Sequence, residues 1–352
     1  MGPQTGEEHL ADPRGGPRGG PSRRRNRASC DSGHRVMMSR PAENDGAQAG
    51  ATFSAGGVSP HHGTDGAERI GVALSGDTRL FPVIGDPIGQ VRSPVALTRV
   101  LTDRGENALV APLHVAPNDL RSVLFGLELI GNVGGVLVTV PHKASAFDCC
   151  ARVSERARFV GSVNVMRKER SGWYGDNADG WGYAEGLAAE GFDVPGRSAL
   201  VVGCGGAGSA VALELLERGA SLLALHDVDA RRRDDLARRL EMRFPGRVRI
   251  GGPDPDGFDL VANVTPMGMK AHDPLPVEVD KLRPEQFVAC AITRPEASAT
   301  IVEARRRGCR TMTGRGMFDG QAEFLADFLL SAERGAGGNG SRIEEPSPSK
   351  QD

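Results

Sequence analysis

A buried-strand sequence that runs straight into a glycine-rich turn constrains the fold most. Residues 198–202 (Ser-Ala-Leu-Val-Val) precede glycines at 203, 205 and 208, and a helix is predicted from Ser209 to Arg218. In this context the first glycine allows a tight turn, the second lets backbone N–H groups approach a pyrophosphate, and the third permits close helix packing. The helix N-terminus favours the phosphate charge. A dinucleotide site, with a purely structural turn as the alternative, is therefore predicted at Gly203, Gly205, Gly206, Ala207 and Gly208.

An acidic residue follows the glycine turn at the distance expected for ribose recognition. The next predicted strand, 222–225, ends at His226 and Asp227, about twenty residues after the glycines. A carboxylate there accepts hydrogen bonds from both ribose hydroxyls and repels a 2′-phosphate, so the sequence favours NAD over NADP as the cofactor. Arg231 and the two arginines after it offer a route to NADP, because guanidinium groups pair with phosphate. A solvated helix face is the other interpretation of that run.

A lysine and an aspartate upstream of the turn predict acid/base chemistry. Lys143 ends the run Val-Thr-Val-Pro-His-Lys over 138–143, which closes a predicted strand and opens a helix, and Asp179 lies in the segment 174–180. An amine and a carboxylate can together take a proton from a substrate alcohol. A nicotinamide accepts only the hydride, so this pair would complete the oxidation of the alcohol. The competing interpretations are a surface lysine at a helix start and an aspartate that caps a helix.

Short apolar runs alternate with amphipathic segments and predict an α/β fold of parallel sheets covered by helices. The 352 residues leave room for two domains, with a helix over 179–190 crossing to a second domain that begins at Ser198. Residues 1–68 and 334–352 lack a hydrophobic period and predict disordered tails. In the first half we expect strands at 81–85, 108–114, 135–140, 162–167 and 173–175, and helices at 94–102, 118–129 and after Pro141.

The composition argues against several functions. Lys and Arg total 43 against 45 Asp and Glu, and no apolar run approaches the roughly 20 residues that span a bilayer. Without the apolar core of a signal peptide, a cytoplasmic location and no membrane partner are expected. The six cysteines form no CxxC pair or zinc-type cluster, which predicts reduced cysteines and no metal site. Outside the N-terminal tail, the sequence has no cluster of basic residues of the kind that binds nucleic acid, so no nucleic-acid partner is expected.

Taken in order, seven motifs resemble the shikimate dehydrogenase family, which includes quinate/shikimate dehydrogenases, over about residues 80 to 332. They are Gly85 to Ser93-Pro94, the 138–143 run, Gly-Ser-Val-Asn at 161–164, Asp-Asn-Ala-Asp-Gly at 176–180, the glycine turn, Asn-Val-Thr-Pro-Met-Gly-Met at 263–269, and Gly316-Met317 with Gln321. The resemblance implies a substrate-binding domain at 69–180, to which a C-terminal helix at 317–333 returns. It also implies a Rossmann-like NAD(P)-binding domain at 181–316, with the substrate in the cleft between the two.

The resemblance implies roles for individual residues as well. It makes Lys143 the catalytic acid/base and has Asp179 hydrogen-bond the same part of the substrate. Gly314 is expected beside the nicotinamide. The carboxylate and ring hydroxyls of the substrate are expected to be held by Ser93, Thr139, Asn164 and Gln321.

Four positions depart from the family's pattern. Where the family usually has a serine, an asparagine, a tyrosine and an aspartate, this chain has Val91, Leu137, Thr293 and Cys290. A site that hydrogen-bonds its substrate discriminates strongly through that bond, so these departures predict altered substrate choice with the chemistry retained. Arg92 or Arg294 could supply the missing contact to the substrate carboxylate, and solvated arginines are the favoured interpretation.

The sequence therefore predicts an NAD-preferring dehydrogenase, with NADP as the alternative cofactor, that reversibly oxidises a ring secondary alcohol. The expected partner is a small cyclic hydroxy acid such as shikimate or quinate, and a homodimer is a possible assembly. Two alternatives stay open: a non-catalytic ligand sensor on the same fold, and a dehydrogenase of a different small hydroxy or amino acid.

Overall fold

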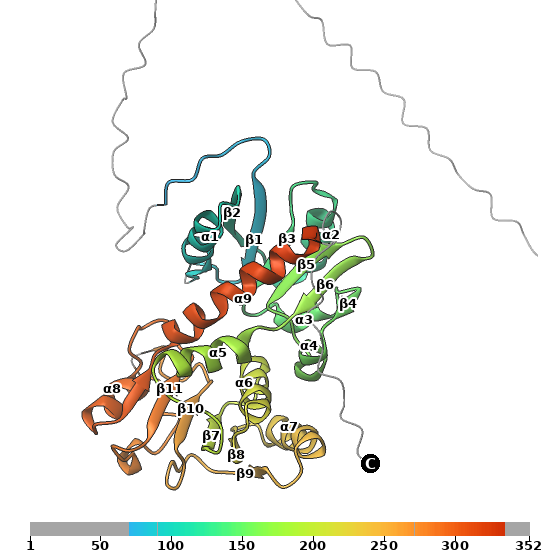
Figure 1. The fold of residues 1–352 in the computed structure, drawn as a ribbon. Coiled ribbons are helices and arrows are strands. Elements are labelled where there is room, and N and C mark those ends of the chain that lie inside the picture. Colours follow the sequence, from blue (N-terminus) through green and yellow to red (C-terminus); the bar gives the residue numbers. More distant parts are fainter. Residues whose placement is uncertain (1–69, 90, 271, 335–352) are drawn as a thin grey trace, which may run out of the picture. The chain divides into compact units, whose positions relative to one another are not determined.

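The structure is a computed structural model that describes residues 70–89, 91–270 and 272–334. The two predicted tails, at 1–68 and 334–352, lie outside the described residues except for Arg334. Within the described ranges the chain forms two six-stranded sheets, one built from β1 to β6 and the other from β7 to β12 (Figure 1). No helix in these ranges is long and apolar enough to cross a membrane.

The first sheet has the strand order β2-β1-β3-β5-β6-β4. Its strands are β1 (Arg79–Gly85), β2 (Ala108–His114), β3 (Gly135–Val138), β4 (Arg152–Val153), β5 (Val165–Glu169) and β6 (Gly172–Asp176). Its helices are α1 (Ser93–Asp103), η1 (Pro117–Asp119), α2 (Leu120–Leu129), α3 (Lys143–Phe147) and α4 (Glu155–Val160).

The first sheet is mixed, so the expectation of an entirely parallel sheet was wrong here. β5 pairs antiparallel with both β3 and β6, while β1 pairs parallel with β2 and β3. Only Arg170 and Ser171 separate β5 from β6. A two-residue connection can close a hairpin but cannot cross over to a parallel neighbour. The antiparallel pairing therefore follows from the length of this turn.

The second sheet is parallel throughout, in the order β12-β11-β10-β7-β8-β9. Its strands are β7 (Ser198–Val202), β8 (Leu222–His226), β9 (Val248–Ile250), β10 (Leu260–Asn263), β11 (Phe287–Cys290) and β12 (Arg310–Met312). The helices around it are α5 (Asp179–Ala189), α6 (Gly206–Glu217), α7 (Ala230–Arg243), η2 (Val279–Lys281), α8 (Ala299–Arg306) and α9 (Gly314–Arg334). This is the doubly wound order, whose strand sequence reverses between β7 and β10; ligands bind at such a reversal, at the carboxyl ends of the strands.

The apolar sequence of β7 is explained by burial on both faces. Ala199 and Val201 belong to one core cluster, and Leu200 and Val202 belong to another. A strand covered by helices on both sides has no solvent-facing residues, so its sequence is continuously apolar rather than alternating. The predicted strand at 198–202 matches β7, and the predicted strand at 108–114 matches β2.

Helix α9 joins the two sheets. It begins directly after β12, and its later residues Leu325, Ala326 and Leu329 lie in the same core cluster as Phe81 and Leu137 of the first sheet. Figure 1 shows α9 leaving the second sheet and running along α5 toward β3 and β5. The two helices approach closely: a Cβ atom added to Gly320 would lie 2.4 Å from the Gly182 carbonyl oxygen.

One helix start differs from the sequence-based expectation, and a second agrees with it. The helix predicted from residue 118 begins as the short η1 turn, and α2 itself starts at Leu120. The helix predicted after Pro141 starts at Lys143, with His142 at the N-cap. The His142 ring is buried and its Nε2 lies 2.7 Å from the Val115 carbonyl oxygen, so this histidine fixes the start of α3.

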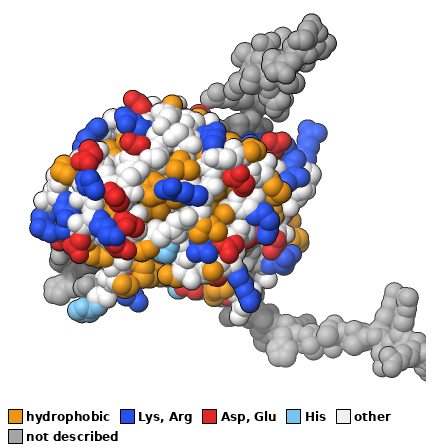
Figure 2. Space-filling model, turned by 90° about the horizontal axis from the view of Figure 1, so that it is seen from below, with side chains coloured by type: hydrophobic (Ala, Val, Ile, Leu, Met, Phe, Trp, Pro, Cys, Tyr) orange, Lys and Arg blue, Asp and Glu red, His pale blue; other side chains and the backbone are white. Residues whose placement is uncertain are grey.

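Charged side chains of both signs are mixed over the face shown in Figure 2. On the arginine-rich helix α7, the positive charges have acidic neighbours. Arg239 lies 2.9 Å from Asp235, and Arg243 lies 2.6 Å from Glu217. Most of these pairs are exposed and contribute little to stability.

Candidate active site

A lysine and an aspartate from different segments form a close ion pair. Lys143 is the first residue of α3, Asp179 is the first residue of α5, and Lys143 Nζ lies 2.6 Å from Asp179 Oδ2. Asp179 is 3% exposed, whereas 22% of the Lys143 side chain is exposed. Asp179 accepts hydrogen bonds from side chains rather than from the N–H groups of its own helix, so it does not act as a helix cap.

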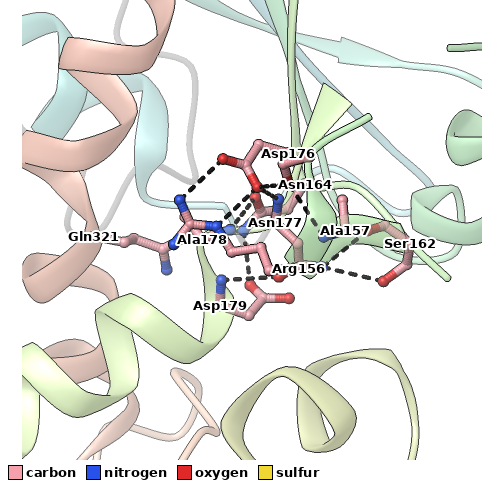
Figure 3. Close-up of polar contacts among 10 residues, drawn as sticks. Arg156, Ala157, Ser162, Asn164, Asp176, Asn177, Ala178, Asp179 and Gln321 are labelled. Carbon is pink, nitrogen blue, oxygen red and sulfur yellow. Dashed lines mark hydrogen bonds and ion pairs between the residues drawn. The ribbon is translucent and has the colours of Figure 1, made fainter. Parts of the chain in front are cut away.

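Two amide side chains extend this pair into a network. Asn164 Nδ2 donates to Asp179 Oδ1 at 2.8 Å and to Gln321 Oε1 at 3.2 Å, and Asn164 Oδ1 accepts from the Ala178 N–H at 2.9 Å. Figure 3 shows Gln321 reaching the group from α9. Four residues expected in the site, which come from four different segments, are thus brought together.

Ser93 and Thr139 lie at the carboxyl end of the first sheet. Ser93 opens α1 after β1, and Thr139 follows β3; both are partly buried. Gly85 leaves room for Thr139, because an added Cβ at residue 85 would lie 2.4 Å from Thr139 Cγ2. Within the described ranges, neither hydroxyl is hydrogen-bonded to Lys143 or Asp179. Parallel strands place their carboxyl ends at one edge, where ligands bind in such sheets.

The glycine turn joins β7 to α6 with the predicted geometry. Gly203 has a positive φ of 101°, which residues with side chains rarely adopt. A Cβ atom at Gly208 would lie only 1.8 Å from the Gly203 carbonyl oxygen, so the third glycine permits the helix to pack against the strand end. An added Cβ at Gly205 meets no atom within 4 Å. Packing does not require this second glycine, whereas close approach of a phosphate does.

Asp227 is tied to the glycine turn. Its Oδ2 accepts from the Cys204 N–H at 2.7 Å, and its Oδ1 accepts from the Asp229 N–H at 2.8 Å. The residue is 8% exposed at the end of β8. The guanidinium closest to it is that of Arg232, at 3.6 Å. Arg231, the arginine expected at the cofactor, is exposed, and its backbone N–H donates to Asp229.

Gly314 is the first residue of α9, which follows the edge strand β12, and it is tightly packed. An added Cβ at Gly314 would lie 2.3 Å from the Ile292 carbonyl oxygen, just after β11. Cys290, at the end of β11, is fully buried, and its sulfur accepts from Asn263 Nδ2 at 3.3 Å and from Ser298 Oγ at 3.2 Å. Cys290 therefore fills a hydrogen-bonded position between two loops.

The departures at residues 91 and 137 lie in apolar surroundings. Leu137 is 4% exposed in the core cluster that also contains Ala178, the neighbour of Asp179, and Val91 packs against the same cluster. Thr293 is partly buried in the loop after β11. Two of the departures therefore belong to the apolar core cluster of the first sheet.

Burial disfavours the thiolate form of two of the described cysteines. The five described cysteines are free. Burial raises the pKa of Cys204, inside the glycine turn, to about 12, and it does the same for Cys150. Thiols with such pKa values carry little thiolate at neutral pH. Among the described residues no cluster of three or more His, Cys, Asp or Glu side chains could hold a metal ion.

Two residues of the 176–180 motif, Asp176 and Asn177, contribute to the site although the sequence predicted no role for them. Asn177 Oδ1 accepts from the Asp179 N–H at 3.0 Å, and Asn177 Nδ2 donates to Ser162 Oγ at 3.1 Å. Asp176 is buried and paired with Arg156. Their position inside a family motif could have indicated this role. Arg156, the partner of Asp176, lies outside every motif, so its sequence context did not indicate a role.

A doubly wound parallel sheet with an open glycine turn, joined to a mixed sheet by a lysine-aspartate pair between α3 and α5, is typical of an oxidoreductase of the Rossmann type. Residues 83–166 match the family model of the shikimate dehydrogenase substrate binding domain. A shikimate dehydrogenase (NADP(+)) from Rubrobacter xylanophilus is 36% identical over 251 residues, which cover 69% of this chain and 88% of that protein.

Solved structures agree with this match. A shikimate dehydrogenase in complex with NADP+ superposes with a TM-score of 0.70 at 26% identity, covering 75% of this chain and 94% of that one. Quinate dehydrogenase from Corynebacterium glutamicum in complex with NAD gives a TM-score of 0.65 at 25% identity, covering 72% and 94%. The chain belongs to the shikimate dehydrogenase family, as its motifs predicted.

Proposed function

We propose that this chain is an NAD(P)-dependent dehydrogenase of the shikimate/quinate type, which reversibly oxidises a ring secondary alcohol of a cyclic hydroxy acid. The observation that carries the proposal is the 2.6 Å contact between Lys143 and Asp179 within a network that includes Asn164 and Gln321. Family membership supplies the reaction class, and the retained pair supplies the acid/base function that the reaction needs.

Lys143 is proposed as the group that takes the hydroxyl proton. When bound, the nicotinamide accepts the hydride from the carbinol carbon. The lysine amine, in its neutral form, accepts the hydroxyl proton as the carbonyl forms, and in the reverse direction the ammonium returns it. Asp179 holds the lysine nitrogen in place and is itself oriented by Asn164, so the proton is transferred at a fixed position.

The residues proposed to hold the substrate are hydroxyl and amide groups at the carboxyl edge of the first sheet and on α9. They present donors and acceptors suited to a carboxylate and ring hydroxyls: Ser93, Thr139, Asn164 and Gln321. The apolar residues Val91 and Leu137 lie in the adjoining cluster. Because these side chains cannot hydrogen-bond a substrate, we propose that choice among cyclic hydroxy acids is altered relative to the family's pattern.

Each of the two sheets is proposed to form the core of one functional domain. Residues 69–180 would form the substrate-binding domain, with 317–333 returning to it, and residues 181–316 would form the dinucleotide-binding domain. Support comes from the core cluster shared by α9 and the first sheet, and from the parallel topology of the second sheet. Cytoplasmic location and a homodimer stay predictions from the sequence.

The glycine turn and Asp227 are proposed to select NAD over NADP. The open space at Gly205 fits a pyrophosphate at the N-terminus of α6. Asp227 and Asp229 place two negative charges at the end of β8, and Arg232 lies 3.6 Å from each. A 2′-phosphate would have to compete with both acids for that guanidinium. The Rubrobacter relative is named for NADP(+), while the quinate dehydrogenase structure contains NAD, so both cofactors occur in the family.

The test is a spectrophotometric assay of cofactor reduction with shikimate, quinate and further cyclic hydroxy acids, each with NAD and with NADP. We expect turnover of at least one cyclic hydroxy acid and higher kcat/KM with NAD. Absence of cofactor reduction on every substrate, with binding of a hydroxy acid retained in calorimetry, would instead establish the ligand-sensor alternative. A clear NADP preference would overturn the assignment of Asp227.

A further inference from the structure

An ion pair between a buried carboxylate and a partly exposed guanidinium lies directly ahead of Asp179 in the chain. Asp176, the last residue of β6, is 3% exposed. Arg156 of α4 binds its carboxylate with two parallel hydrogen bonds, Nε to Oδ1 at 2.9 Å and Nη2 to Oδ2 at 3.1 Å. The Ser154 hydroxyl and the Asn177 N–H also donate to Oδ1. Such a fork fixes the orientation of a carboxylate as well as its position.

The paired carboxylate fixes the segment that delivers Asp179. The Asn164 N–H donates to the Asp176 carbonyl oxygen at 3.0 Å, and the Asn177 side chain accepts from the Asp179 N–H at 3.0 Å. Figure 3 shows Asp176 and Asp179 at the two ends of this segment, with Arg156 beside it. Movement of Asp176 would therefore displace both Asn164 and Asp179.

The same guanidinium contacts the helix that carries Gln321. Arg156 lies over the ring of Phe324 of α9, with its Cζ atom 4.6 Å from the ring centroid. Phe324 is three residues after Gln321, so the two side chains lie on neighbouring positions of one helix face. Arg156 thus touches the strand end before Asp179 and the helix face beside Gln321.

We propose that Arg156 is a positioning residue for the reaction: it sets the register of the Asp179 segment against α9, so that Asp179, Asn164 and Gln321 keep their mutual geometry. This inference rests on the proposed function, because it assigns Arg156 to the dehydrogenase site. The competing explanation is an ion pair that serves only the stability of the fold, since removing one partner of a buried pair leaves an uncompensated charge.

A double-mutant design separates the two explanations. Arg156→Ala leaves Asp176 unpaired, and adding Asp176→Asn removes that charge again. If Arg156 positions the site, the double variant regains thermal stability while kcat stays at least about tenfold below wild type. If the pair is only structural, kcat recovers together with the melting temperature, and the proposal fails. Arg156→Lys keeps the positive charge but cannot form the two parallel hydrogen bonds, so its kcat should lie between those of Arg156→Ala and wild type.

Two further measurements make the result specific. The KM for the cofactor should stay within about twofold in Arg156→Ala while the kcat with the hydroxy acid falls, because the glycine turn does not contact Arg156. Arg170→Ala, an exposed arginine in the turn between β5 and β6, is the matched control and should behave as wild type. An equal loss of kcat in Arg170→Ala would contradict the proposal. So would a change in the cofactor KM as large as the change in kcat with the hydroxy acid.

Hydrogen-deuterium exchange tests the positioning without relying on turnover. In Arg156→Ala the amides of 177–179 and of the α9 turn around Gln321 should exchange faster, with those of α8 unchanged. An inactive wild-type protein would refute the proposed function while this exchange pattern still decided the role of Arg156. Unchanged exchange at 177–179 would refute the positioning role even if the enzyme is active.

Discussion

Asn164 donates a 2.8 Å hydrogen bond to Oδ1 of Asp179, the carboxylate oxygen that Lys143 leaves free. Both oxygens of this nearly buried carboxylate therefore have a side-chain partner, and its orientation is fixed from two directions. The lysine nitrogen in turn is held at one position near solvent, with 22% of its side chain exposed. The arrangement suits a proton carrier that must meet both substrate and water.

Replacement of the lysine tests its role in proton transfer. Lys143→Ala should lower kcat by at least about a hundredfold and change substrate KM much less, because general acid/base catalysis contributes about 10² to 10⁴ in rate. Lys168→Ala on β5 is the matched control, since its Nζ bonds only the Ile130 carbonyl within the described chain. Steady-state kinetics with saturating cofactor measures both; an unchanged rate in Lys143→Ala would exclude this lysine as the base.

Asn164 should matter for both chemistry and substrate binding. Asn164→Ala leaves Asp179 Oδ1 and Gln321 Oε1 without this donor, and loss of a hydrogen bond to a charged group costs about 1.5–3 kcal/mol. We expect kcat/KM to fall by roughly ten- to a hundredfold. Asn107→Ala, which removes an exposed asparagine far along the chain from the site, should leave kcat/KM at the wild-type value. Equal kcat/KM in the two variants would argue against a role for Asn164.

A pair of glycine variants distinguishes packing from cofactor contact. Gly208→Ala places a methyl group 1.8 Å from a backbone oxygen and should lower the melting temperature strongly. Gly205→Ala meets no protein atom within 4 Å, so the fold should be kept while the Kd for NAD rises. Thermal unfolding and cofactor titration measure the two effects. Wild-type cofactor affinity in Gly205→Ala would show that the pyrophosphate lies elsewhere.

Cofactor choice should respond to the charge at residue 227. Asp227→Asn keeps an acceptor for the Cys204 N–H but removes a negative charge and releases Arg232 from one of its two acidic neighbours. The ratio of kcat/KM with NADP to that with NAD should rise about tenfold, because like charges at a binding site disfavour the ligand. Arg232→Ala in the same background should reverse the gain. If Asp227→Asn leaves the ratio unchanged, discrimination lies at other residues.

Acid sensitivity should involve Asp259, which holds the start of β7. Burial alone would raise the pKa of this carboxyl, but hydrogen bonds from the Ser198 N–H and hydroxyl, together with Arg197, lower it below its usual value. A lowered pKa means that the ionised group stabilises the fold above the unfolded pKa of about 3.9 and loses this effect as the pH falls below it. Asp259→Asn should thus destabilise the protein at pH 7, and the difference should shrink toward pH 3 in urea unfolding. A difference independent of pH would contradict this assignment.

Local sequence signals predicted the second sheet better than the first. The glycine turn after β7 depends on neighbouring residues only, and so it was predictable with its strand and helix. The β5–β6 hairpin was equally local, through Arg170 and Ser171, but the alternation of apolar runs favoured a parallel sheet and concealed it. The pairing of β3 with β5 depends on tertiary packing, which periodicity does not encode.

The site was predictable as a set of residues but not as a geometry. Lys143 and Asp179 were indicated by residue type and position, whereas Asn164 and Gln321 came from the family resemblance. The contact of Gln321 with Asn164 arises only when α9 returns to the first sheet. Arg156 resembles any solvated arginine at a helix start, because its significance lies in Asp176 and Phe324, which are distant in sequence. A buried partner of this kind has no local signature.

The shared core of α9 and the first sheet also sets an order of events during synthesis. Phe81 and Leu137 are translated early, yet Leu325, Ala326 and Leu329, which cover them, are among the last described residues to leave the ribosome. Domains usually complete folding in the order in which they are made. Here the core of the half made first is completed only when α9 has been made, so folding of the first sheet cannot finish before the last described helix emerges.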